Sequence, residues 1–340
     1  MPHSPCKSMS RRQWLRAAAF LTVGAMVPRT LYGQNGDELP VPQGEITNAA
    51  AAGPWWMQAA RERSRVVLID ARRIVPNGLP TGAVAASILG QGVELLTHGR
   101  SNGGPWDAIL EGRQRVLITF SPIGASELRT NAPLARALVR ELQRAGREPG
   151  SITLLGIGRD VTRELGCRPP PIGWGGGITV AGQREQLAQA VLESDAILNV
   201  GVLRTHRFAG MSGCLLDLAM GVVRRPARYF ENGCSPHVGE IVASREIAGR
   251  LRLNILNAMR VVFRGGPEPE HSAISDPAAL LLSFDPVAVD FMGMDLLMAE
   301  RRRQGLSDGE PAPHLQTAEE LGLGRGDWQG VERVVREFVG

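Results

Sequence analysis

Short apolar runs rich in β-branched residues alternate with segments of helical periodicity from about residue 65 to the end of this 340-residue chain. Runs of this length, bounded by turn residues, are typical of strands buried in a sheet. Strands that alternate with helices form a mainly parallel sheet covered by helices on both faces. The sequence therefore predicts a single α/β domain over 61–340, with strands at 65–70, 115–120, 151–155, 196–200, 251–263 and 280–284.

The segments between these strands carry helical patterns and two breaks. Three consecutive prolines and the run Gly175-Gly176-Gly177 exclude a regular helix from 166–182, which we expect to be a loop. Residues 204–207 follow a strand, and we expect them to form a polar turn. Helices are expected at 81–96, 133–145, 183–193, 212–223, 237–249 and 286–303, with short helices in the tail 314–339.

The first 33 residues have the pattern of a targeting segment. Ser10-Arg11-Arg12-Gln13-Trp14-Leu15-Arg16 is similar to a twin-arginine signal, and the apolar stretch 17–27 that follows is shorter than the roughly 20 residues that span a bilayer. Residues 34–60 are expected to link this signal peptide to the domain. We therefore expect the twin-arginine translocase to export the protein to the periplasm or beyond, with no transmembrane segment in the mature chain. The alternative is a basic N-terminal tail on a cytoplasmic protein.

The charge of the chain is concentrated in this first segment. The whole sequence has 38 basic and 34 acidic residues, and 1–33 holds five of the basic residues and no acidic one. The remaining chain is nearly neutral, so no nucleic-acid partner is expected. Lys7 is the only lysine of the sequence. Without another lysine, the mature chain cannot hold a lysine-linked cofactor.

Three cysteines remain beyond the signal segment: Cys167, Cys214 and Cys234. Their wide spacing lacks the C-x-x-C pattern of zinc or iron–sulfur sites. Cys214 and Cys234 are expected to be packed thiols or one local bridge. The alternative is that Cys234, His237 and Glu240 contribute to a metal site, because such side chains suit a borderline metal.

Two motifs give the chain a resemblance to a known family. The first is Leu203-Arg204-Thr205-His206 with its glycine-containing continuation 208–215, and the second is Asp285-Pro286-Val287-Ala288-Val289-Asp290. Gly322-Leu323-Gly324 follows near the end. In these motifs the chain resembles the bacterial and archaeal domain of unknown function family 362 (DUF362), over about 65–330.

The departures from the family pattern limit what the resemblance implies. Arg204 stands where many members have lysine, and Leu216-Asp217 stands where they often have Lys-Asn. The ferredoxin-like cysteine clusters of many relatives are absent from the sequence, so no iron–sulfur cluster is expected. The chain is also remotely similar to nickel-pincer lactate racemases, whose cofactor is attached through a lysine that this mature chain lacks. The cofactor is left unknown.

The first motif supplies candidate ligand-binding groups, because open α/β sheets bind ligands at strand ends. His206 can move a proton or ligate a metal, and Arg204 and Arg207 can bind a carboxylate or phosphate, with Thr205 between them. Gly213 begins a helix whose N–H groups can face the same anion. The alternative is a solvated turn with no specific role.

The second motif supplies two carboxylates. Asp285 is expected to contribute to ligand binding, although Asp followed by Pro is also the pattern of a helix N-terminus. Asp290 lies among apolar residues and needs a buried partner. We assign His206 and Asp290 as candidate catalytic residues, and His206, Asp290 and His237 as candidate metal ligands. If strands 196–200 and 280–284 are parallel neighbours, the two motifs meet at one sheet edge.

Two functions remain open from the sequence. The first is an exported enzyme, dependent on a metal or cofactor, that acts on a small anionic substrate. The second is a periplasmic protein that binds a small anion or a partner without turnover. The substrate and reaction class are not assigned.

Overall fold

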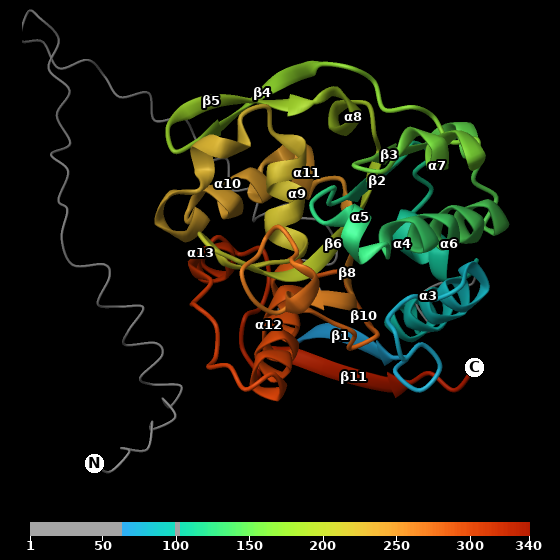
Figure 1. The fold of residues 1–340 in the computed structure, drawn as a ribbon. Helices are drawn as coiled ribbons and strands as arrows, with labels where there is room; N and C mark the ends of the chain where they lie inside the picture. Colours follow the sequence, from blue (N-terminus) through green and yellow to red (C-terminus); the bar gives the residue numbers. More distant parts are fainter. Residues whose placement is uncertain (1–62, 99–102) are drawn as a thin grey trace, which may run out of the picture. The chain divides into compact units, whose positions relative to one another are not determined.

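Nine strands form one mixed sheet in the computed structural model, which describes residues 63–98 and 103–340. Along the sheet the order is β11-β1-β10-β8-β6-β2-β3, with β7 paired to β6 and β9 to β8 (Figure 1). The strands are β1 (Ser64–Asp70), β2 (Val116–Phe120), β3 (Ile152–Leu155), β6 (Ala196–His206), β7 (Gly210–Ser212), β8 (Leu251–Val262), β9 (Ile274–Ser275), β10 (Ala279–Ser283) and β11 (Val331–Glu337). The expected signal peptide 1–33 and linker 34–60 lie outside the described residues.

Four of the six neighbouring pairs along this order are parallel, which confirms the predicted fold class. The pairs β11–β1, β8–β6, β6–β2 and β2–β3 are parallel. Strand β10 is antiparallel to both β1 and β8. The condition that strands 196–200 and 280–284 are parallel neighbours is therefore wrong: β8 lies between them. The segment 263–278 between β8 and β10, all of which the structure describes, holds no crossover helix, so the chain returns antiparallel.

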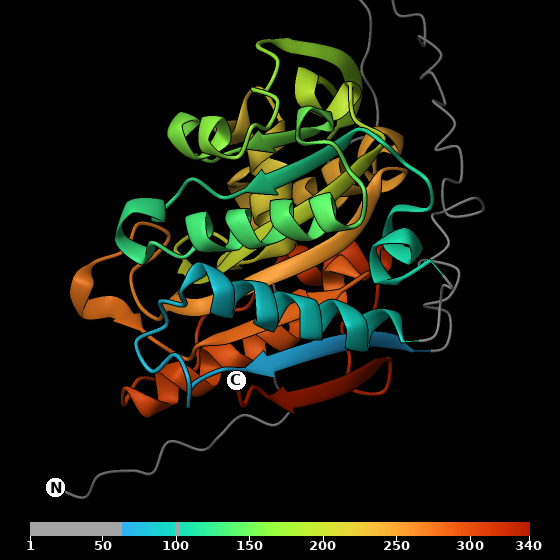
Figure 2. The ribbon, with the colours of Figure 1, turned by 90° about the vertical axis from the view of Figure 1, so that its right-hand side faces the viewer.

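Helices cover both faces of the sheet. On one face lie α3 (Gly82–Thr97) and α6 (Asn131–Arg144), which Figure 2 shows across the front of the strands. On the other face α9 (Cys214–Val222) packs on β6, and α12 (Pro286–Arg303) packs on β8 and β10. The other α-helices are α4 (Pro105–Leu110), α5 (Ala125–Leu128), α7 (Arg159–Glu164), α8 (Gln189–Leu192), α10 (His237–Ala243), α11 (Arg245–Ala248) and α13 (Pro313–Glu320).

Local sequence explains where α3 begins and how closely it packs. The Thr81 hydroxyl accepts the N–H of Val84, which caps the helix. Gly92 faces the sheet, and a Cβ at this position would lie 2.6 Å from the Leu282 side chain. Glycine is therefore needed for α3 to approach β10. No helix within the described ranges is long and apolar enough to cross a membrane.

A hairpin replaces the second half of the predicted loop 166–182 and the first half of the predicted helix 183–193, whose end is helical as α8 (Gln189–Leu192). Strands β4 (Trp174–Val180) and β5 (Gln183–Ala188) pair antiparallel across the two-residue turn Ala181-Gly182. Both turn residues have positive φ, 49° and 73°, as a tight type I′ hairpin requires. The strand β11 likewise replaces part of the predicted helical tail, because pairing with β1 satisfies its backbone.

Candidate functional site

The Arg-Thr-His segment expected to be a turn is the end of a strand. Arg204, Thr205 and His206 are the last three residues of β6, and they pair with β7, which returns antiparallel after a short turn. All three side chains are buried. The structure therefore extends the predicted strand 196–200 by six residues, because β7 and β8 supply partners on both sides of β6.

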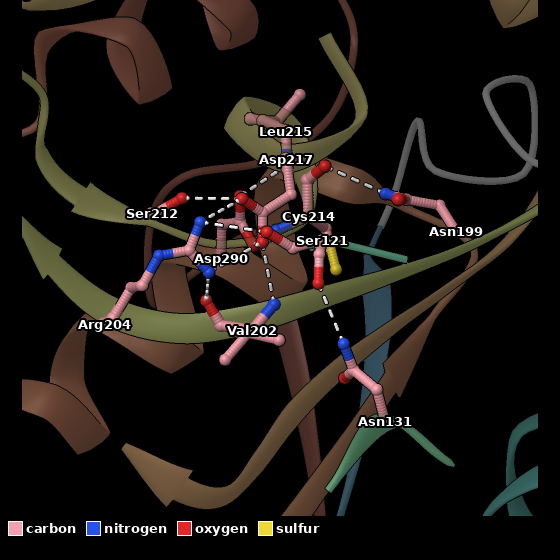
Figure 3. A network of polar contacts seen from close by, with 10 residues as sticks. All are labelled: Ser121, Asn131, Asn199, Val202, Arg204, Ser212, Cys214, Leu215, Asp217 and Asp290. Carbon is pink, nitrogen blue, oxygen red and sulfur yellow. Dashed lines mark hydrogen bonds and ion pairs between the residues drawn. The ribbon is translucent and has the colours of Figure 1, made fainter. Parts of the chain in front are cut away.

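Arg204 is held by an acidic residue of the same chain. Its Nη2 lies 2.5 Å from Oδ1 of Asp217, on α9, and the two side chains are only 1% and 5% exposed. Asp217 also accepts the Ser212 hydroxyl and the N–H of Val202, each at 2.9 Å (Figure 3). A buried guanidinium compensated in this way is not available to an external anion.

Asp290 holds the beginning of another helix. Its Oδ1 and Oδ2 accept the N–H groups of Cys214 and Leu215, at 2.7 and 2.8 Å, at the start of α9 (Figure 3). Gly213, at the N-cap, has no side chain to do this, and a Cβ there would lie 2.4 Å from Asp290 Oδ1. Asp290 therefore caps α9 across the core, and Gly213 leaves room for its carboxyl group.

Burial controls the titration of Asp290. The side chain is fully buried, and this raises its pKa to about 7, while the N–H groups of Leu215 and Cys214 act in the opposite direction. The nearby carboxylates Asp217 and Asp285 raise the pKa further. Both oxygens of Asp290 already accept main-chain hydrogen bonds, so the carboxyl group has a structural role in holding α9.

Asp285 caps the helix that it precedes. Its Oδ1 accepts the N–H groups of Val287 and Ala288, both at 2.8 Å, at the start of α12. Its Oδ2 accepts the hydroxyl of Ser64 and the N–H of Arg325. Burial raises its pKa to about 6, against the effect of these hydrogen bonds. Asp285 is therefore the N-cap of α12, as the Asp-Pro sequence pattern allowed.

The Gly-Leu-Gly motif near the C-terminus belongs to the same arrangement. A Cβ on Gly324 would lie 1.8 Å from Oδ1 of Asp285. The glycine therefore allows the chain at 322–325 to pass close to the cap of α12.

His206 is held as a neutral ring. Its Nδ1 accepts the N–H groups of Phe208 and Ala209, at 3.3 and 3.1 Å, so the ring proton sits on Nε2. The ring stacks on Phe230 at 5.7 Å between centroids. Burial, and then the positive charge of Arg204, lower the His206 pKa to about 4. Such a ring is a hydrogen-bond donor at neutral pH and does not offer a lone pair at Nε2 to a metal.

Thr205 and Arg207 differ in exposure. The Thr205 hydroxyl donates to the Val262 carbonyl and accepts the N–H of Gly266 at 3.0 Å, so it joins β6 to the loop after β8. Arg207 is exposed, and its ion pair with Glu268 at 3.1 Å is exposed as well. Exposed ion pairs of this kind contribute little to stability, so Arg207 can leave Glu268 and pair with another anion.

The candidate metal ligands have separate surroundings. His237 begins α10, and its ring lies 5.5 Å from that of Tyr229. Glu240 accepts the N–H of Ala181, in the hairpin turn. Over 63–98 and 103–340, no group of three or more His, Cys, Asp or Glu side chains could hold a metal ion. The structure thus does not bring His206, Asp290 and His237 together as a ligand set. Cys167, Cys214 and Cys234 are buried free thiols.

Several polar residues of this region were not singled out from the sequence. Asn199 donates to the carbonyl of Cys214 and to Asn254 Oδ1, at 2.9 and 3.1 Å, and all of these groups are buried. An Asn within an apolar strand was the available signal, because a buried amide needs partners. His314 is fully buried, and neither of its ring nitrogens has a hydrogen-bond partner among the described residues.

The fold is that of an α/β protein in which one D-P-V-A-x-D motif caps two helices. Its first aspartate, Asp285, caps α12, and its last, Asp290, caps α9. Comparison with known families agrees with the resemblance: the family described as Domain of unknown function (DUF362) matches residues 176–295. This segment contains β6, α9 and the start of α12. No curated protein matches the chain.

One solved structure similar to this chain is that of the lactate racemase apoprotein from Thermoanaerobacterium thermosaccharolyticum. The two chains are 12% identical, with a TM-score of 0.35 over 68% of this chain. The match spans 57% of the racemase chain.

Proposed function

We propose that this protein is an exported binding protein for a small organic anion, with its ligand site at the carboxyl end of β6. The observation that carries the proposal is the state of His206. Because Nδ1 accepts two main-chain N–H groups, the ring is a neutral donor through Nε2. This donor lies in an aromatic cluster at a strand end, which is where α/β proteins bind ligands.

The His206 patch, made of His206, Arg207, Phe208 and Phe230, suits an anion with an apolar part. Phe208 is 52% exposed, and its ring lies 5.6 Å from that of Phe230. The Arg207 guanidinium lies 5.5 Å from the Phe208 ring centroid. A guanidinium next to aromatic faces can bind a carboxylate while the rings contact the apolar part of the ligand.

Binding without turnover is supported better than catalysis by the surroundings of the acidic residues. Both oxygens of Asp290 accept main-chain N–H groups, and Arg204 is paired with Asp217. A general base needs a free oxygen within reach of a substrate proton. Metal analysis of the purified protein separates the two functions, since a stoichiometric bound metal would favour the enzyme.

The binding site is tested with benzoate, whose ring and carboxylate match the two parts of the patch. Benzoate should raise the melting temperature of the wild-type protein, because a ligand that binds the folded state stabilises it. The shift should be lost in Arg207→Gln and in Phe208→Ser and kept in Arg163→Gln, a change of an exposed arginine on α7. An equal shift in all three variants would refute the site.

Export by the twin-arginine route is the second part of the proposal and rests on Arg11 and Arg12, which lie outside the described residues. Replacing both by lysine keeps the charge and removes the paired arginines. The precursor should then remain in the cytoplasm, whereas Arg29→Lys should leave export unchanged. Normal periplasmic accumulation of the double variant would contradict the assignment.

A further inference from the structure

A basic cavity lies at the opposite end of β6, near the amino ends of β2, β6 and β8. It is open and has a volume of about 520 Å³. It lies between the segment before β2, the residues that precede β6 and the residue before β8. Its polar lining consists of Arg113, Arg115, Arg250, Ser194, Glu111 and Asp195.

A buried arginine lies two residues beyond Arg250, which lines this cavity. Arg252, in β8, is 2% exposed, and within the described part of the chain its guanidinium donates only to the main-chain carbonyls of Leu251 and Gly249, both at 3.1 Å. Its Nε has no hydrogen-bond partner among the residues that the structure describes. Burial, and then the charge of Arg113 in the cavity wall, lower the pKa of Arg252 to about 10, while the carboxylate of Glu111 acts in the opposite direction. Arg252 and the cavity therefore share one electrostatic environment.

The carboxylates at the cavity compensate only part of its positive charge. Arg115 pairs with Asp195 at 2.5 Å, and Arg113 pairs with Glu111 at 2.9 Å.

The guanidinium groups of Arg250 and Arg252 form no ion pair with an acidic residue over 63–98 and 103–340. Arg250 donates to the main-chain carbonyls of Ser194 and Glu246, at 2.9 and 2.7 Å, and Arg252 has only the carbonyl partners given above. Arg252 is buried and Arg250 is half-buried, and charges that are removed from water without an ion-pair partner favour the binding of an external anion.

We propose that this cavity binds a phosphate group, as inorganic phosphate or as part of a small phosphate monoester. Two guanidinium groups without an acidic ion-pair partner match the charge of a phosphate dianion, and guanidinium N–H geometry suits phosphate oxygens. Arg250 and Arg113 line the cavity and can contact the ligand, while Arg252 adds positive potential. The volume leaves room for the organic part of a monoester.

This site is separate from the His206 patch. The two lie at opposite ends of β6, whose eleven residues, at about 3.3 Å each, place them roughly 30 Å apart. Phe208→Ser should therefore leave phosphate binding unchanged, so the failure of either site can be recognised independently of the other.

The test is calorimetric titration of the full chain at low salt with inorganic phosphate and, separately, with phenyl phosphate. Arg250→Gln should weaken binding by about tenfold or more, as expected when a guanidinium–phosphate contact is lost. Arg252→Met should weaken it similarly and, without phosphate, should leave the melting temperature equal or higher, because it removes an uncompensated charge. Arg163→Gln is the matched control and should bind as the wild type does.

Tighter binding of phenyl phosphate than of phosphate would identify a monoester as the ligand, and equal binding would identify the free ion. The proposal is wrong if the wild-type protein binds neither probe, or if Arg250→Gln binds both as the wild type does. If Arg252→Met does not fold, phosphate binding by Arg250→Gln alone tests the proposal.

Discussion

Asp290→Asn tests whether the buried carboxyl group that caps α9 is protonated in the folded protein. Asn keeps the size of the side chain but offers one acceptor oxygen where Asp290 offers two. One of the N–H groups of Cys214 and Leu215 then loses its acceptor, which costs about 1–3 kcal/mol for a buried donor. The variant should fold with this loss of unfolding free energy.

The pH dependence carries the sharper part of the prediction. Burial raises the Asp290 pKa from 3.8 to about 7. A raised carboxyl pKa means that the folded state binds more protons than the unfolded state between these values, so the stabilisation is fully present below about pH 4 and is lost by about pH 7. The difference of about three pKa units corresponds to at most about 4 kcal/mol. Asn does not titrate, so the deficit of Asp290→Asn should shrink as pH rises.

Urea unfolding of the wild-type protein and Asp290→Asn, from about pH 4 to about pH 8, measures this difference. Asp285, with its pKa raised to about 6, contributes in the same direction in both proteins, so most of its contribution cancels, apart from its repulsion of the Asp290 carboxylate. A deficit that grows with pH would refute the reasoning. It would show that the two N–H groups and the N-terminus of α9 favour the carboxylate more than burial disfavours it.

Three further changes probe the same network by urea unfolding. Asp285→Ala should lower the unfolding free energy by about 2 kcal/mol through loss of the cap of α12, and an unchanged value would contradict its capping role. Gly324→Ala should cost about 1–3 kcal/mol, because the new Cβ overlaps the Asp285 carboxyl group; a neutral effect would show that the chain moves freely there. Arg204→Met should cost about 3–5 kcal/mol by leaving Asp217 unpaired, and adding Asp217→Leu should restore part of this loss; strictly additive effects would exclude coupling.

The strands of the sheet could be predicted from sequence where burial is complete. The runs that became β1, β2, β3 and β10 are apolar and short, and the structure places them close to the predicted bounds. The hairpin β4–β5 was missed because Gln183–Ala188 contains good helix formers, and pairing across the hairpin outweighs that preference. The antiparallel direction of β10 could not be predicted either, since it depends on how β8 connects to β10.

The sequence likewise predicted only part of the candidate site. The unusual position of Asp290 in an apolar helix signalled a buried partner, and the structure supplies one. The identity of that partner depends on contacts across 76 residues of sequence, which one sequence does not reveal. The role of Asp217 was missed for the same reason, because its ion pair with Arg204 forms only after α9 folds back on β6.

The place of β1 in the sheet constrains the order in which the molecule can fold. β1 is the first strand along the described chain, yet both of its neighbours, β10 and β11, are formed by residues 279–283 and 331–337. A nascent chain that ends before residue 279 therefore lacks both of the strands that pair with β1. Contacts of such long sequence separation close late and slow folding. The sheet can therefore be completed only after residues 331–337 have been synthesised.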